Sequence, residues 1–168
     1  MSGQIAAAPQ YADDGAVPAA LAAVAAHTAK AAEAVAAGNL PEAHEALEGI
    51  RAEIGALHSR NGLATFSDRM NAYHAAMETV LATDPAGLDA TGMELLAEKV
   101  GVLACWANKI ATHPAPEAAD PAYQPLTDAF QASAAAMQQA VRSGDAAAVK
   151  AALAGLKPAY SKVFVQFG

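Results

Sequence analysis

Side chains that bind metal ions gather in one segment of the chain. Met70, His74 and Met77 occupy positions i, i+4 and i+7, a spacing that places two thioethers and an imidazole on one side of a helix. Thioethers and imidazoles are ligands that copper(I) prefers. Glu78 follows four residues after His74, and a carboxylate beside an imidazole suits a harder ion. The segment therefore predicts a metal site, with copper favoured and zinc or iron as the other transition metals.

A second set of polar residues precedes this segment at spacings that also share one helix face: His44, Glu48, Arg51 and His58. An antiparallel hairpin turning at Asn61-Gly62 would bring His58 to the start of the next helix, near His74. One nearby imidazole would then complete the coordination. The predicted metal ligands are His44, Glu48, His58, Met70, His74, Met77 and Glu78.

An ordinary structural interpretation exists for each set. Met70, Tyr73 and Met77 also form a core stripe, with His74 at its edge and its ring partly hydrated, because methionine is a common residue in helical cores. Glu48 and Arg51 are neighbours on a helix surface and would form a solvated ion pair. Both interpretations stay open at this point.

Composition sets the fold class and excludes several functions. Of the 168 residues, 54% are hydrophobic and only 5% aromatic, so the apolar content is mostly alanine, the strongest helix former. The net charge of -7 comes with scattered basic residues, which excludes nucleic acid as a partner. No uninterrupted apolar run reaches the roughly 18 residues of a membrane span.

Catalytic signatures are absent from the sequence. It contains no glycine-rich phosphate loop, no nucleophile elbow and no Glu-x-x-His repeat of di-iron bundles, so we expect no enzyme. Cys105, the only cysteine, excludes an intrachain disulfide. Its position beside Trp106 in an apolar stretch predicts a small buried hydrophobic residue.

Turn signals divide the chain into a flexible arm, residues 1–15, and a single helical domain, residues 16–168. Helices are predicted at about 17–37, 41–59, 67–83, 91–112, 123–142 and 145–167, with Ser67 and Asp145 as N-caps. The predicted fold is all-α, an antiparallel up-and-down four-helix bundle with additional short helices.

One helical hairpin resembles another 106 residues later. Gly38-Asn39 falls on Gly144-Asp145, Ala46-Leu47 on Ala152-Leu153, and Ile54 on Tyr160. Two such hairpins packed face to face would form the four-helix bundle. Chance similarity between two alanine-rich hairpins is the alternative to a duplication.

Residues 145–167 resemble the last helix of the cytochrome c-prime family, periplasmic four-helix bundles that attach haem through a CxxCH motif. The run from Ala152 to Leu156 leads to the place of that motif. Tyr160 and Val163 occupy the cysteine positions and Phe164 the position of the haem-ligating histidine. The resemblance implies the bundle fold and a periplasmic location. Covalent haem is not implied, and these residues with Phe167 predict an aromatic core instead.

These observations favour a non-enzymatic helical bundle that binds a metal ion, with copper preferred. The chain begins without a basic, leucine-rich secretion signal, although residues 6–10 suit the start of a processed, exported chain. The alternative is a haem-free, cytochrome c-prime-like bundle that acts as a small-molecule-binding or scaffold protein. Expected partners are a metal ion or a small apolar ligand, and a homodimer is also open.

Overall fold

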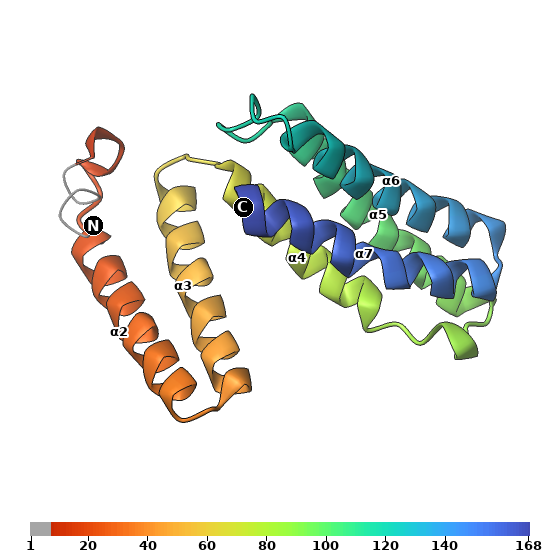
Figure 1. Cartoon of the computed structure of the whole chain (residues 1–168), viewed down its shortest axis with the longest axis horizontal. Coiled ribbons are helices and arrows are strands. Elements are labelled where there is room, and N and C mark those ends of the chain that lie inside the picture. The colour runs from red at the N-terminus through yellow and green to blue at the C-terminus, as the bar shows by residue number, and fades with distance from the viewer. Residues whose placement is uncertain (1–7) are drawn as a thin grey trace. The chain divides into compact units, whose positions relative to one another are not determined.

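The computed structural model describes residues 8–168. Over that range the chain is helical, without a strand, which confirms the all-α class. No helix in this range is both long and apolar enough to cross a membrane. The elements are η1 (Pro9–Tyr11), α2 (Val17–Ala36), α3 (Leu40–Arg60), α4 (Phe66–Leu81), η2 (Pro85–Gly87), α5 (Ala90–Thr112), α6 (Tyr123–Ser143) and α7 (Ala146–Phe167) (Figure 1).

Side-chain caps start several of these helices where the sequence predicts a start. Asn39 begins α3 and accepts a hydrogen bond from the backbone N–H of Glu42, and Asp145 does the same for Ala147 in α7. The prediction that Ser67 caps a helix is wrong, because α4 already begins at Phe66. Local capping interactions therefore define the starts of α3 and α7, and the predicted start of α4 is one residue late.

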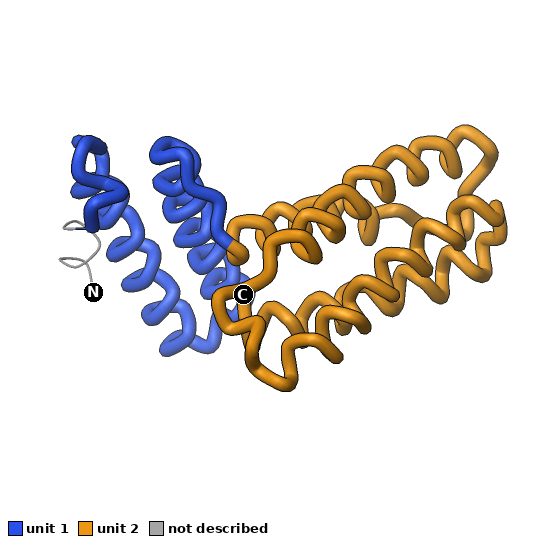
Figure 2. The backbone as a smooth tube through the Cα atoms, turned by 90° about the horizontal axis from the view of Figure 1, so that it is seen from above, with its two compact units in different colours: residues 1–65 blue, residues 66–168 orange. Residues whose placement is uncertain are grey.

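The chain divides into two compact units, residues 1–65 and residues 66–168 (Figure 2). The first holds α2 and α3, and the second holds α4 to α7. Length and composition predict one domain over residues 16–168, whereas the contacts cluster on either side of the bond between Thr65 and Phe66.

In the first unit, α2 and α3 pack against each other as a hairpin. Their contact is made largely by alanines, and five of them are buried: Ala20, Ala31, Ala34, Ala43 and Ala46. The His27 ring of α2 lies against Gly49 of α3, where an added Cβ would collide with it. Small side chains therefore let the two helices approach closely.

Part of the predicted N-terminal arm is attached to this hairpin. Residues 1–7 of the arm lie outside the described residues, but Pro9–Tyr11 forms a 3-10 helix and Tyr11 is buried. The Tyr11 ring stacks on His58, with the ring centroids 6.4 Å apart. Asp14 accepts a 2.7 Å hydrogen bond from Asn61, the main cause of the lowered pKa of this carboxyl. The second half of the arm is thus ordered against the end of α3.

In the second unit, each helix packs mainly against two others: α4 packs against α5 and α7, and α6 packs against the same two helices. Tyr73 and Phe130 lie at the centre of the core with no exposed surface, and their rings meet edge to face at 4.6 Å. Other large side chains that are fully buried here are Met70, Met77, Met137, Leu96, Leu103, Ile110 and Leu156. This core is much larger than the cluster in the first unit.

The links of the two similar hairpins share one backbone conformation. Gly38 and Gly144 have φ values of 73° and 68°, in the left-handed region that favours glycine. Each is followed by a capping side chain, Asn39 or Asp145. The equivalence drawn from the sequence therefore extends to the geometry of both turns.

Candidate metal centre

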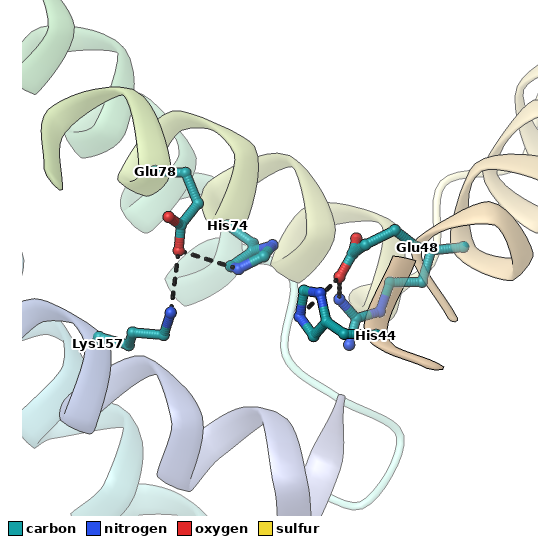
Figure 3. Close-up of polar contacts among 6 residues, drawn as sticks. His44, Glu48, His74, Glu78 and Lys157 are labelled. Atoms are coloured by element: carbon teal, nitrogen blue, oxygen red, sulfur yellow. Dashed lines mark hydrogen bonds and ion pairs between the residues drawn. The ribbon is translucent and has the colours of Figure 1, made fainter. Parts of the chain in front are cut away.

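His74 and Glu78 lie one turn apart on the surface of α4. His74 Nε2 and Glu78 Oε1 are 3.4 Å apart (Figure 3). Lys157, from α7, approaches the same carboxylate oxygen, with its Nζ also 3.4 Å away. An imidazole, a carboxylate and an ammonium group therefore meet at one point of the second unit.

The imidazole of this cluster is held by aromatic rings. His74 stacks on Tyr160 of α7, with ring centroids 5.3 Å apart and planes inclined by 17°. Tyr160 stacks in turn on Phe164, at 5.4 Å. Only 18% of the His74 side chain is exposed. The stacking fixes the ring close to Glu78 and lowers the conformational entropy that a bound ligand would cost.

Met70 and Met77 belong to the hydrophobic core of the second unit and have no exposed surface. Tyr73 between them is equally buried, and this burial raises the pKa of its hydroxyl far above the usual range. The core stripe formed by these three residues is confirmed, and His74 lies at its partly exposed edge. The thioethers serve as packing groups in this arrangement.

The first unit holds a second pair with the same spacing. His44 Nε2 and Glu48 Oε1, both on α3, are 3.6 Å apart (Figure 3). The His44 side chain is 67% exposed, compared with 18% for His74, and Arg51 forms an ion pair with Glu48. The ion pair expected between Glu48 and Arg51 is therefore confirmed. This carboxylate already has a close cationic partner.

His58, the third predicted ligand of the first unit, stacks on Tyr11. The hairpin that would join it to His74 connects residues of different units, so that part of the predicted site stays a prediction. Among residues 8–168, no group of three or more His, Cys, Asp or Glu side chains is arranged to hold a metal. The His74–Glu78 pair is thus a candidate centre that would supply two protein donors.

The chain matches no protein-family model. No curated protein and no solved structure is significantly similar to it either. The candidate centre therefore has to be judged on its own geometry.

The predicted aromatic core near the end of α7 is present in the structure. Tyr160, Val163 and Phe167 are buried, and Phe164 packs against the same core at its edge. This confirms the packing predicted for these positions. It also explains why Tyr160 is available to the His74 ring.

Sequence reasoning missed two partners of the centre and misjudged the thiol. The approach of Lys157 and Tyr160 to His74 and Glu78 depends on the contact between α4 and α7, which no local spacing reveals. Cys105 is exposed on α5, so the prediction of a buried thiol is wrong. The apolar residues around it in sequence face outward as well as inward.

Proposed function

We propose that this chain is a non-enzymatic metal-binding protein whose second unit is an up-and-down four-helix bundle with a copper site at His74 and Glu78. The observation that carries the proposal is the 3.4 Å separation of His74 Nε2 and Glu78 Oε1 beside a stacked, partly buried ring. The resemblance of α7 to the cytochrome c-prime family supports a periplasmic location.

The contact pattern supports the bundle. Each of the four helices packs mainly against two others in the order α4, α5, α6, α7 and back to α4, which is the arrangement of neighbours in an up-and-down bundle. Short links favour antiparallel neighbours, and Gly144 with Asp145 makes such a link between α6 and α7. In this bundle α4 and α7 are neighbours, so Lys157 of α7 lies next to His74 and Glu78 of α4.

The two donor atoms lie close enough to bind one metal ion after a small movement. Adjacent ligands bound at about 2.0 Å in the tetragonal geometry of copper(II) lie about 2.8 Å apart, so His74 Nε2 and Glu78 Oε1 would approach each other by about 0.6 Å from their separation of 3.4 Å. A bound cation would replace the Lys157 ammonium, whose 3.4 Å contact with Glu78 is an exposed ion pair of small stability. Water completes the coordination, since two donors come from the protein.

Copper(II) is the preferred ion for such a donor set. Affinity for a site of nitrogen and oxygen ligands rises along the divalent series to copper and falls again at zinc. The burial of Met70 and Met77 leaves their thioethers out of the donor set that we propose, so a preference for copper(I) is not expected. Glu78 supplies the harder ligand.

Calorimetric titration of the full, metal-free chain with Cu²⁺ and Zn²⁺ tests the site. We expect saturable binding that is tighter for Cu²⁺. His74→Ala and Glu78→Gln should each weaken Cu²⁺ binding by more than about tenfold, the loss that even an outer-shell partner of a ligand can cause.

His44→Ala and Glu48→Gln are the matched controls, because they remove a pair of the same spacing. Neither should change Cu²⁺ affinity. The proposal fails if the chain does not bind Cu²⁺ saturably, or if the His44 and Glu48 variants weaken binding while the His74 and Glu78 variants do not.

A groove between α6 and α7 favours a second candidate function, the binding of a small apolar ligand. Its volume is about 590 Å³, and alanines form most of its lining, among them Ala136, Ala140, Ala148 and Ala152. The equivalent positions of the first hairpin, 106 residues earlier, hold Lys30 and Glu42 in place of Ala136 and Ala148, joined by a 3.6 Å ion pair. The groove between α6 and α7 is thus open at positions where the first hairpin has an ion pair between Lys30 and Glu42.

Grafting that ion pair tests the second candidate. If the groove binds apolar molecules, the dye 1-anilinonaphthalene-8-sulfonate should fluoresce with the native chain, and Ala136→Lys combined with Ala148→Glu should abolish the signal by filling the groove. His74→Ala should leave the signal intact, which separates this function from the metal site. Dye binding that is equal in the native and grafted chains would exclude the groove as the binding place.

A further inference from the structure

We propose that the outer face of α5 is a contact surface on which a second copy of this chain packs with its own α5 antiparallel. This goes beyond the metal site and uses none of its residues. The face carries two large apolar side chains in water, Leu95 at 55% and Val102 at 54% exposure, and the exposed Cys105 lies about one turn after Val102. The buried residues of α5 lie on its other side: Leu96, Val100, Leu103, Ala107 and Ile110.

The exposed residues follow the spacing of a coiled-coil seam. Leu95, Val102 and Lys109 are seven residues apart, and Glu98 and Cys105 fall between them at the second position of each heptad. Such a seam forms one straight stripe along a helix and fits the seam of a partner helix. Val102 and Cys105 form the middle of this stripe, Glu98 and Lys109 flank them, and Leu95 lies beyond Glu98.

The charges select both the partner and its direction. In an antiparallel pair with the two-fold axis midway between Val102 and Cys105, Glu98 faces Lys109 of the second copy. The symmetry repeats this contact, so that two opposite-charge pairs flank a centre where Val102 meets Cys105 of the second copy. A parallel pair in register would place Glu98 against Glu98 and Lys109 against Lys109. Like-charge contacts of this kind exclude that arrangement.

The expected association is weak, because one helix pair buries less area than the roughly 1,600 Å² of a standard interface. In a single chain the Lys109 ammonium lies 4.1 Å from the centroid of the Trp106 ring, so the charge is held at the α5 surface. A reversible dimer that forms at high protein concentration is therefore the expected state.

The single cysteine provides a direct test without added mutations. In the full chain, a short bis-maleimide should couple Cys105 to Cys105 of a second copy and give a covalent dimer, because both thiols lie close to the two-fold axis. Sedimentation velocity should also give an average mass that rises with concentration. A monofunctional maleimide that fails to label Cys105, or an absence of cross-linked dimer, would overturn the proposal.

Charge-reversal variants distinguish the proposed antiparallel pairing of α5 from non-specific cross-linking between colliding chains. Glu98→Lys and Lys109→Glu should each weaken dimerisation by about tenfold, because each replaces two attractive contacts by two repulsive ones. The double variant restores opposite charges and should recover dimerisation. Val102→Asp should abolish it, whereas the matched control Val165→Asp, at an 85% exposed position of α7, should not. Equal cross-linking in all of these variants would also overturn the proposal.

Discussion

Phe130→Ala is expected to lower the free energy of unfolding of the second unit by about 3–5 kcal/mol, the cost of truncating a buried aromatic residue. Phe130 has no exposed surface and meets the Tyr73 ring edge to face at 4.6 Å. Such a pair adds about 0.5–1.5 kcal/mol to the stability gained from area burial alone. The loss combines both contributions with the cavity that the ring would leave.

The measurement is urea unfolding followed by the fluorescence of Trp106, the single tryptophan, which lies in the second unit. This choice matters, because a chain of two units need not unfold in one step. Val165→Ala is the control, and we expect a change within about 0.5 kcal/mol at this exposed position. A loss below about 1 kcal/mol in Phe130→Ala would contradict the packed aromatic centre, since fully buried aromatic residues cost more.

Met77→Ala is expected to destabilise the second unit by about 2–5 kcal/mol, since Met77 is fully buried in the same core. Met77→Leu keeps most of the volume and should cost less than about 1.5 kcal/mol. The pair of variants separates packing from coordination, because leucine preserves the first and removes the thioether. The same urea titration measures both.

Copper binding by the leucine variants completes the test. In Met70→Leu combined with Met77→Leu, the affinities for Cu²⁺ and for Cu⁺ should stay at their native values, because neither thioether belongs to the proposed donor set. Suppose instead that this variant loses much of its copper affinity but still unfolds cooperatively. That result would indicate that the methionine thioethers coordinate copper, and it would contradict the proposed donor set.

Much of the helical pattern could be predicted because its causes are local. Alanine runs, the capping residues Asn39 and Asp145, and the left-handed turns at Gly38 and Gly144 act within a few residues of sequence. The core stripe on α4 was also predictable, since hydrophobic spacing identifies the buried face of a helix. These predictions did not require knowledge of which helices meet.

The centre depends on contacts that sequence spacing does not contain. Lys157 and Tyr160 reach α4 from α7, about eighty residues later, and only the packing of the two helices brings them to Glu78 and His74. Conversely, Cys105 was assigned to the core because apolar residues surround it in sequence, although Val102 faces outward. When an alanine-rich helix carries apolar residues on both faces, the sequence pattern does not identify which face is buried.

The division between Thr65 and Phe66 was not predictable for a related reason. Alanine is abundant on both sides of it, and the Asn61-Gly62 turn resembles the other helix ends of the chain, although eight of the nine aromatic residues lie after the boundary. The predicted set of ligands combines residues on both sides of the boundary because they are close in sequence. The two ligands of the proposed copper site both lie on α4.

Pulsed EPR of the full chain loaded with equimolar Cu²⁺ tests the copper centre most directly. The remote nitrogen of a copper-bound imidazole modulates the echo, and we expect this modulation in the native chain and in His44→Ala, and its loss in His74→Ala. An unchanged spectrum in His74→Ala, or a loss confined to His44→Ala, would contradict coordination by His74.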